Sequence, residues 1–215
     1  MSFPKGNVVE VYYDVISPYS WMAIEVPDEL CQKVHFLQVF LVLYWSPMNH
    51  GAALHNLIIS LHYFSFVNRL FFRQGDRKAL GCWNKPVRYD TLNAQCFLTS
   101  IELNNPKYLI VACQEVFKRM WLTGKPVHQI EHLKEAAVNI GLPDADKIIS
   151  AIGSPRVKET LKKRTHTATD IGAFGTPWII VKRPDKSAIS FFGMTPMAMI
   201  VDLLKCSDPL IRSKI

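Results

Sequence analysis

The segment Ser17-Pro18-Tyr19-Ser20 places two hydroxyls at CxxC spacing, directly after an apolar run. Pro18 suits the first turn of a helix because its missing N–H would have no partner there, and Ser17 before it is a typical capping residue. A hydroxyl at a helix N-terminus can donate a hydrogen bond to a thiolate brought by a ligand, but it cannot exchange disulfides. Ser17 is therefore either a donor to an anionic ligand or only a helix cap.

A second motif, Gly172-Ala173-Phe174-Gly175-Thr176-Pro177, lies directly before a run of β-forming residues. A proline at this place is commonly cis, and a cis X-Pro bond is uncommon enough to have a reason. We expect the turn to leave the N–H and C=O of Thr176 unpaired, so that both can pair with an extended peptide. The alternative is an ordinary tight turn that contains glycines.

The cysteines and histidines show neither a disulfide framework nor a metal site. The chain has five cysteines at wide, irregular spacing and no CxxC pair. His128 and His132 could share a helix face, but no cysteine or carboxylate motif completes a ligand set. We therefore predict no metal and free thiols, as in a reducing compartment or an organelle interior.

Charge and hydropathy exclude further classes. The chain carries 25 Lys+Arg against 18 Asp+Glu, a net charge of +7, which suits an anionic ligand, an acidic partner or nucleic acid. The basic residues are scattered, and Lys162-Lys163-Arg164 is read as a solvated helix face, so no nucleic-acid binding is predicted. The most apolar runs fall far short of the ~18 residues that a membrane-spanning helix needs, so no membrane span is predicted.

The pattern along the chain predicts strands and helices in a definite order. The first strand covers Val8 to Asp14, a helix runs from about Tyr19 toward Cys31, a strand covers His35 to Leu43, and a mostly helical stretch extends from Gly51 to Ser154. Within that stretch, the helical apolar period is present over Cys96 to Leu103, Leu109 to Trp121 and Ile130 to Ile140. Then follow a helix over Pro155 to Asp170, strands over Trp178 to Lys182 and Ala188 to Phe192, and a helix over Thr195 to Lys205.

A β-α-β unit followed by a β-hairpin and a closing helix is the element order of the thioredoxin fold. We therefore predict an α/β protein with a thioredoxin-like fold and a helical domain inserted in its middle. Residues 1–50 and 165–215 would form the thioredoxin-like domain, and residues 51–164 the inserted helical domain.

The two motifs together resemble those of a known family. The segments from Tyr13 to Trp21 and from Gly172 to Pro177 are similar to the signatures of kappa-class glutathione transferases, a DsbA-like family that includes 2-hydroxychromene-2-carboxylate isomerases. The resemblance extends over residues 8–43 and 91–205. Residues 43–90 do not show the family's Gly-Asn-Pro-Pro loop, through either true divergence or a gene-model error.

The resemblance implies that Ser17 is the catalytic residue, whose hydroxyl stabilises the thiolate of bound glutathione. It implies that glutathione contacts Ser17, Pro18, Tyr19, Thr176, Pro177, Met194 and Thr195. The family has a Ser-Asp pair where this chain has Met194-Thr195, so the carboxylate that would pair with the ligand's ammonium is missing. The loss of such a charged hydrogen bond is expected to weaken glutathione binding by roughly 1 to 3 kcal/mol.

By the same resemblance, the chain is a detoxification enzyme that conjugates or reduces small electrophiles or peroxides, and it forms a homodimer. A glutathione-dependent isomerase is one alternative, and a degenerate, non-catalytic thioredoxin-fold protein is another. The final Ser213-Lys214-Ile215 is close to the Ser-Lys-Leu peroxisomal address, which favours the peroxisome over the mitochondrion or cytoplasm.

Overall fold

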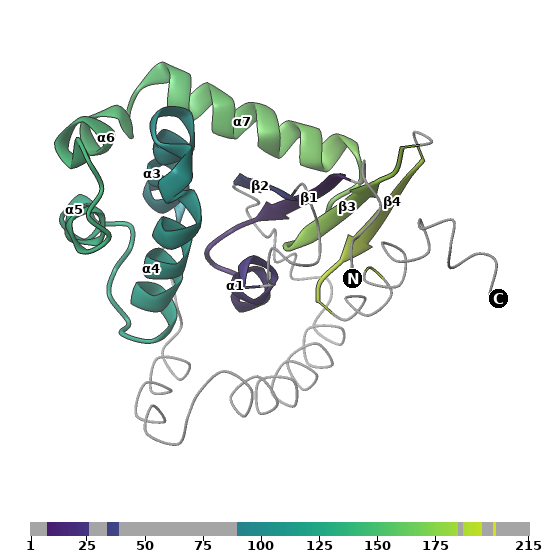
Figure 1. Ribbon diagram of the computed structural model, residues 1–215, viewed down its shortest axis with the longest axis horizontal. Coiled ribbons are helices and arrows are strands. Elements are labelled where there is room, and N and C mark those ends of the chain that lie inside the picture. Colours follow the sequence, from purple (N-terminus) through teal and green to yellow (C-terminus); the bar gives the residue numbers. More distant parts are fainter. Residues whose placement is uncertain (1–7, 26–33, 39–89, 185–186, 195–199, 201–215) are drawn as a thin grey trace.

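The computed structural model describes residues 8–25, 34–38, 90–184, 187–194 and 200 (Figure 1). For residues 34–38 only the backbone is described. The remainder of the first predicted helix, the end of the second strand, the first part of the helical stretch and the last helix, apart from residue 200, lie outside these ranges. Among the described residues, no helix combines the length and the apolar character that a membrane crossing requires.

The sheet has four strands in the order β2-β1-β3-β4. Their bounds are Val8–Tyr13 for β1, Val34–Gln38 for β2, Trp178–Lys182 for β3 and Ala188–Phe192 for β4. β2 is parallel to β1, whereas β3 is antiparallel to β1 and β4 is antiparallel to β3. Tyr12 near the end of β1 lies opposite Trp178 at the start of β3. This register brings the segment that leads to Ser17 beside the segment that ends in Pro177.

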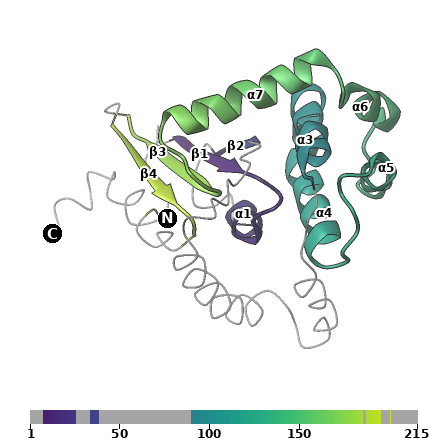
Figure 2. The same ribbon diagram turned by 180° about the vertical axis from the view of Figure 1, so that it is seen from behind.

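The two faces of the sheet carry different apolar side chains because side chains alternate along each strand. Helix α1 (Pro18–Ile24) packs on the face formed by Val9, Val11, Ile179 and Val181. Helix α7 (Pro155–Asp170) packs on the opposite face, with Ala168 against Tyr12, Trp178 and Ile180. Figures 1 and 2 show α1 and α7 on opposite sides of the sheet.

Four helices form a block beside the sheet, and α7 runs from this block to β3 (Figures 1 and 2). They are α3 (Leu92–Asn104), α4 (Leu109–Trp121), α5 (Ile130–Asn139) and α6 (Ala145–Ala151), with a 3₁₀ turn at Pro106–Tyr108. The core of the block contains the fully buried Phe97 and Phe117 and continues to Tyr13 and Val15. One apolar core therefore joins the helical block to the segment that leads to Ser17.

The predicted boundaries agree closely with the structure. The predictions for α4, α7, β3 and β4 are confirmed residue for residue, and β1 ends one residue earlier than predicted. Helix α1 begins at Pro18, as expected for a proline in the first turn. Helix α3 begins at Leu92, earlier than the predicted Cys96, because residues of its first turn are polar or exposed and do not show the apolar period. The α/β class is confirmed.

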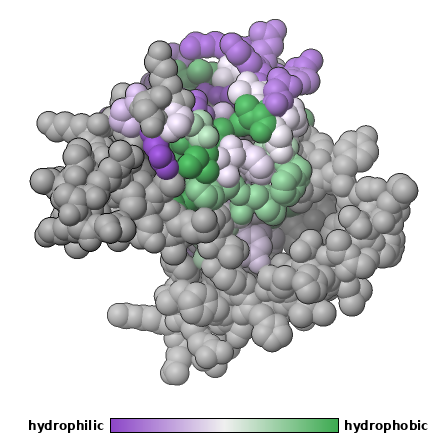
Figure 3. Space-filling view, turned by 90° about the vertical axis from the view of Figure 1, so that its right-hand side faces the viewer, coloured by the Kyte–Doolittle hydropathy of each residue, from purple (hydrophilic) through white to green (hydrophobic). Residues whose placement is uncertain are grey.

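Phe174, in the turn before β3, and Phe192, at the end of the edge strand β4, form an exposed aromatic pair beside the buried ring of Trp178. Phe174 is 70% exposed and Phe192 47% exposed, and their ring centroids lie 4.7 Å apart. Figure 3 shows hydrophobic side chains on this side of the molecule, below a hydrophilic rim. A Cβ atom at Gly175 would lie 2.6 Å from Cε2 of Phe192. Glycine is therefore required at position 175 for the ring to lie against the turn before Thr176.

Candidate functional site

Ser17 lies between β1 and α1 and caps the helix. Its Oγ accepts a hydrogen bond from the Ser20 N–H at 3.3 Å, and its hydroxyl donates to the Thr176 carbonyl at 3.0 Å. Its own N–H donates to the Asp14 carbonyl at 3.0 Å. The oxygen of the hydroxyl is thus used in the helix cap, while its proton is directed at an acceptor. The cap and donor roles of Ser17 are compatible.

The Thr176-Pro177 peptide bond is cis, as predicted. The expectation that the Thr176 carbonyl is unpaired is wrong, because the Ser17 hydroxyl, brought close by the pairing of β1 with β3, donates to it. The Thr176 N–H has no hydrogen-bond partner among the residues that the structure describes. The structure therefore brings together Ser17 and Thr176, which are 159 residues apart, and leaves one backbone donor beside them.

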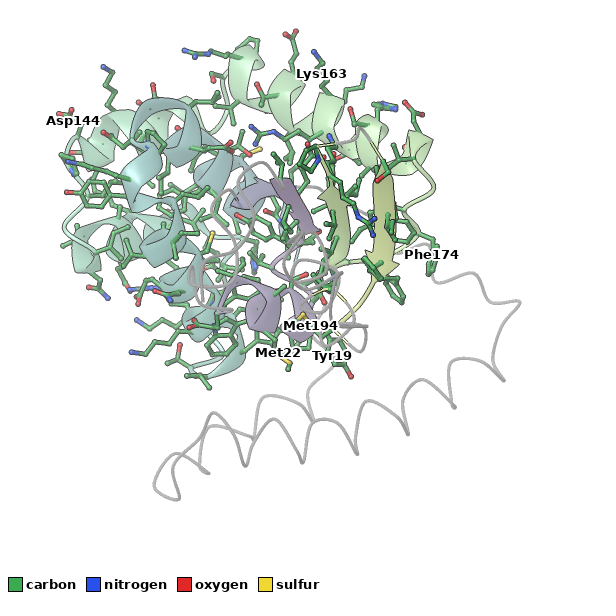
Figure 4. All side chains as sticks on the ribbon, turned by 45° about the vertical axis from the view of Figure 1, so that its right-hand side comes forward. Tyr19, Met22, Asp144, Lys163, Phe174 and Met194 are labelled. Atoms are coloured by element: carbon green, nitrogen blue, oxygen red, sulfur yellow. The ribbon has the colours of Figure 1, made fainter. Side chains whose placement is uncertain are left out.

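The other predicted site residues lie around this pair. Pro18 and Tyr19 are half-buried in the first turn of α1, and Pro177 is buried. Met194 is 7% exposed and belongs to the apolar cluster against which Tyr19 and Met22 pack. In Figure 4, Met194, Tyr19 and Met22 lie together, while Phe174 lies apart from them near β4. Thr195 lies outside the described residues.

A buried polar network lies behind Ser17, centred on Asp14. One oxygen of its carboxyl group, Oδ1, accepts hydrogen bonds from the Ile16 N–H at 3.1 Å and from the Thr91 hydroxyl at 2.9 Å. The side chain of Gln95 donates to the Tyr13 carbonyl at 3.4 Å. Asp14, Thr91 and Gln95 are almost completely buried. Sequence reasoning gave Asp14 no role, although it lies inside the recognised motif, because its partner Thr91 is 77 residues away.

Burial raises the pKa of Asp14 to about 6, against the lowering effect of the hydrogen bonds from Ile16, Gln95 and Thr91. The nearby Asp90 raises it further, and no cation contributes to the shift. The carboxylate is therefore held by neutral donors in a buried environment, which disfavours the charged form.

This shift predicts a dependence of stability on pH. The pKa of the Asp14 carboxyl is about 6 in the folded protein, whereas its ordinary value is 3.8. The group therefore contributes stability that is fully present below pH 3.8 and is lost as the pH rises through 6. The stability lost by neutral pH is about 3 kcal/mol. Because asparagine does not ionise, we expect the change in stability caused by Asp14→Asn to be more favourable at about pH 7.5 than at about pH 4. Urea unfolding of both proteins at the two pH values measures this, and equal effects at both would contradict it.

The two described cysteines, Cys96 and Cys113, are free, as predicted, and both are buried. Burial raises the pKa of Cys113 to about 12, although the hydrogen bond with the Tyr13 phenol, 2.9 Å between Oη and Sγ, lowers it. Burial also raises the pKa of Cys96. Because the thiolate is the reactive form, neither thiol is poised for redox chemistry.

We predict that iodoacetamide at about pH 8 leaves Cys96 and Cys113 unmodified in the folded protein and alkylates both in urea. Peptide mass spectrometry gives the result for each cysteine separately. Alkylation of Cys113 in the folded protein as fast as in urea would contradict the buried position.

The described parts of the chain contain no group of three or more His, Cys, Asp or Glu that could hold a metal ion. A depression of ≈ 530 Å³ opens in the helical block, with Arg119, Lys125 and Lys134 in its lining. Each of these cations pairs with a carboxylate at 2.7–2.9 Å. These three cations of the depression are therefore already paired with carboxylates.

The chain is similar to proteins of known class. Residues 79–205 match the family model of the DSBA-like thioredoxin domain. Human glutathione S-transferase kappa 1 is 27% identical, over 94% of this chain and 92% of that protein. These matches confirm the resemblance found in the two motifs.

Solved structures agree in fold. 2-Hydroxychromene-2-carboxylate isomerase matches with a TM-score of 0.65 at 19% identity, over 92% of this chain and 94% of that one. The cytosolic disulfide reductase DsbM from Pseudomonas aeruginosa with GSH matches with a TM-score of 0.63 at 12% identity, over 95% and 99%. The predicted thioredoxin-like, DsbA-like fold is confirmed, whereas the domain boundaries stay a prediction. The chain belongs to the DSBA-like thioredoxin domain family.

Proposed function

We propose that the protein is a glutathione-dependent transferase of the kappa class, in which the Ser17 hydroxyl stabilises the glutathione thiolate. The observation that carries the proposal is the hydrogen bond from Ser17 to the carbonyl of Thr176, beside an N–H without a partner among the described residues. The similarity to human glutathione S-transferase kappa 1 over most of both chains supports the same assignment. So does the fold match to DsbM, whose structure contains GSH.

The Ser17–Thr176 pair suits a peptide that carries a thiolate. On binding, the Thr176 carbonyl accepts the N–H of the cysteinyl residue, and the Thr176 N–H donates to its carbonyl, as in an added strand. The Ser17 hydroxyl, displaced from Thr176, donates to the sulfur. Because its oxygen still accepts the Ser20 N–H, this exchange does not uncap α1. A charge-assisted hydrogen bond of this kind is stronger than the neutral bond that it replaces.

The chemistry requires a nucleophilic sulfur held beside an electrophile. Glutathione supplies the sulfur, its thiol proton passes to solvent, and the S–C bond forms as a leaving group such as halide departs with its electron pair. Ser17 does not form a covalent bond. It lowers the pKa of the thiol, and the backbone of Thr176 orients the cysteinyl part.

A glutathione-dependent isomerase is the second candidate, favoured by the fold match to 2-hydroxychromene-2-carboxylate isomerase. The same site would add the thiolate reversibly to a double bond and release it after rotation. A non-catalytic binding protein is the third candidate, because the buried Met194 offers no charge to the ligand's ammonium group. The homodimer expected from the family is part of the proposal.

The test is a glutathione titration of the purified protein by calorimetry, followed by conjugation of an aryl halide. The proposal expects saturable binding in the millimolar range or tighter and conjugation above the uncatalysed rate. Isomerase turnover without conjugation would favour the second candidate. No binding by a cooperatively folded protein would contradict the proposed function.

A further inference from the structure

The turn that carries Ser17 is attached to the helical block at two points. The carboxyl Oδ1 of Asp14 accepts from the hydroxyl of Thr91 at 2.9 Å, at the start of α3. The carbonyl of Val15 accepts from the indole Nε1 of Trp121 at 3.0 Å, at the end of α4. On its other side, the turn contacts the sheet domain through the bond from Ser17 to Thr176. The position of the Ser17 hydroxyl thus depends on both parts of the molecule.

The use of the Thr91 hydroxyl is unusual for its place in the helix. A threonine at an N-cap position normally accepts from a backbone N–H of its own helix. Thr91 makes no such bond, and its hydroxyl donates instead to a carboxyl group that is distant in sequence. The Asp14 carboxyl in turn accepts from the Ile16 N–H at 3.1 Å, directly before Ser17. The pair fixes the backbone of the turn rather than a helix end.

Both side chains of the Asp14–Thr91 pair are buried, Asp14 with 1% and Thr91 with 3% of its surface exposed, so the pair has lost its hydration. A buried carboxyl group without a cation is normally disfavoured. Its hydrogen bonds with Ile16 and Thr91 hold the turn, and the N–H of Ser17 donates to the carbonyl of the same Asp14.

We propose that Asp14 and Thr91 are positioning residues for the transferase reaction: their hydrogen bond holds the turn in which the Ser17 hydroxyl faces the thiolate. This inference rests on the proposed function, since it takes Ser17 as the thiolate donor. Asp14 and Thr91 do not touch the ligand in this account. They act through the backbone of Ile16 and Ser17.

The test compares Thr91→Val, which removes the hydroxyl, with Thr91→Ser, which keeps it. Thr99→Val is the matched control, because Thr99 is a buried threonine on the same helix whose hydroxyl bonds within α3, to the Gln95 carbonyl at 2.8 Å. The first readout is the pKa of the bound glutathione thiol, followed by thiolate absorbance. The second is amide hydrogen exchange at Ile16 and Ser17. The third is kcat and the KM for glutathione.

In Thr91→Val we expect about a tenfold smaller thiolate-to-thiol ratio and kcat at neutral pH, with an almost unchanged KM, on the scale of one hydrogen bond. We expect exchange at Ile16 and Ser17 to quicken by about tenfold or more. Thr91→Ser should keep the wild-type thiolate-to-thiol ratio, kcat and hydrogen exchange, and Thr99→Val should change none of them. If Thr91→Val does not fold, Thr91→Ala provides the same comparison with Thr91→Ser.

The outcomes separate the two proposals. Glutathione binding with an unchanged thiol pKa in Thr91→Val, or the same loss in Thr99→Val, would overturn the positioning role and leave the proposed function intact. Failure of the wild-type chain to bind glutathione would overturn the proposed function, and the positioning role with it.

Discussion

Replacement of Ser17 by alanine is expected to reduce the rate of glutathione conjugation by about a hundredfold at neutral pH. The change removes the hydroxyl that we propose as the thiolate donor, and the loss of one such preorganised donor to an anion costs about 10²–10³ in rate. Conjugation of an aryl halide at saturating glutathione, measured for both proteins, gives the ratio. Unchanged conjugation in Ser17→Ala would contradict the role of Ser17.

Two variants separate this effect from the loss of the helix cap. Ser17→Ala also removes the acceptor of the Ser20 N–H, which costs about 1 kcal/mol of stability. Ser17→Thr keeps both the hydroxyl and the cap, so it should retain more activity than Ser17→Ala. Ser20→Ala is the matched serine control, because the buried Ser20 hydroxyl has no partner among the described residues. We expect the Ser20→Ala variant to conjugate glutathione at nearly the wild-type rate.

The largest loss of stability is expected for Phe117→Ala. Phe117 is 0% exposed and lies in the core that joins α4 to the segment before α1. Its ring stacks on Trp21 at 6.0 Å between centroids and lies 6.4 Å from the ring of Tyr13. Truncation of a buried phenylalanine leaves a cavity and costs about 3 to 5 kcal/mol. Urea unfolding monitored by circular dichroism measures the change in free energy.

Phe174→Ala is the control of the same residue type. Phe174 is 70% exposed, and its ring centroid lies 5.4 Å from that of Trp178 and 4.7 Å from that of Phe192. Its truncation leaves no buried cavity and should lower the free energy of unfolding by less than about 1 kcal/mol. A similar loss in both variants would mean that Phe117 is not the interior contact that the structure indicates.

Local signals explain why much of the fold could be predicted. Helix α7 begins with the capping Ser154 and Pro155, and β3 is a continuous run of apolar residues, so each boundary is marked by residues at the boundary itself. The start of helix α3 is not marked in this way, because Leu92 is exposed and Asn93 and Gln95 are polar, so the apolar period begins only at Cys96. The side chains of the buried Gln95 and Thr99 in this helix donate hydrogen bonds to backbone carbonyls, which a sequence pattern does not show.

The candidate site was predictable only where a motif marks it. Ser17 and Thr176 each lie in a local motif, and the structure confirms the helix cap and the cis bond that these motifs predict. The contact between them was missed because it depends on the register of β1 against β3. The hydrogen bonds of Thr91 and Trp121 could not be predicted for the same reason, since each joins a residue far away in sequence and no local pattern marks the pairing.

The pKa of the glutathione thiol in the complex tests the central claim most directly. Thiolate absorbance is followed against pH with saturating glutathione, for the wild-type protein and for Ser17→Ala. The account predicts that the bound thiol titrates below the value of about 8.5 for a free cysteine thiol, and that the value returns toward 8.5 in Ser17→Ala. The same pKa in both complexes would contradict stabilisation of the thiolate by Ser17.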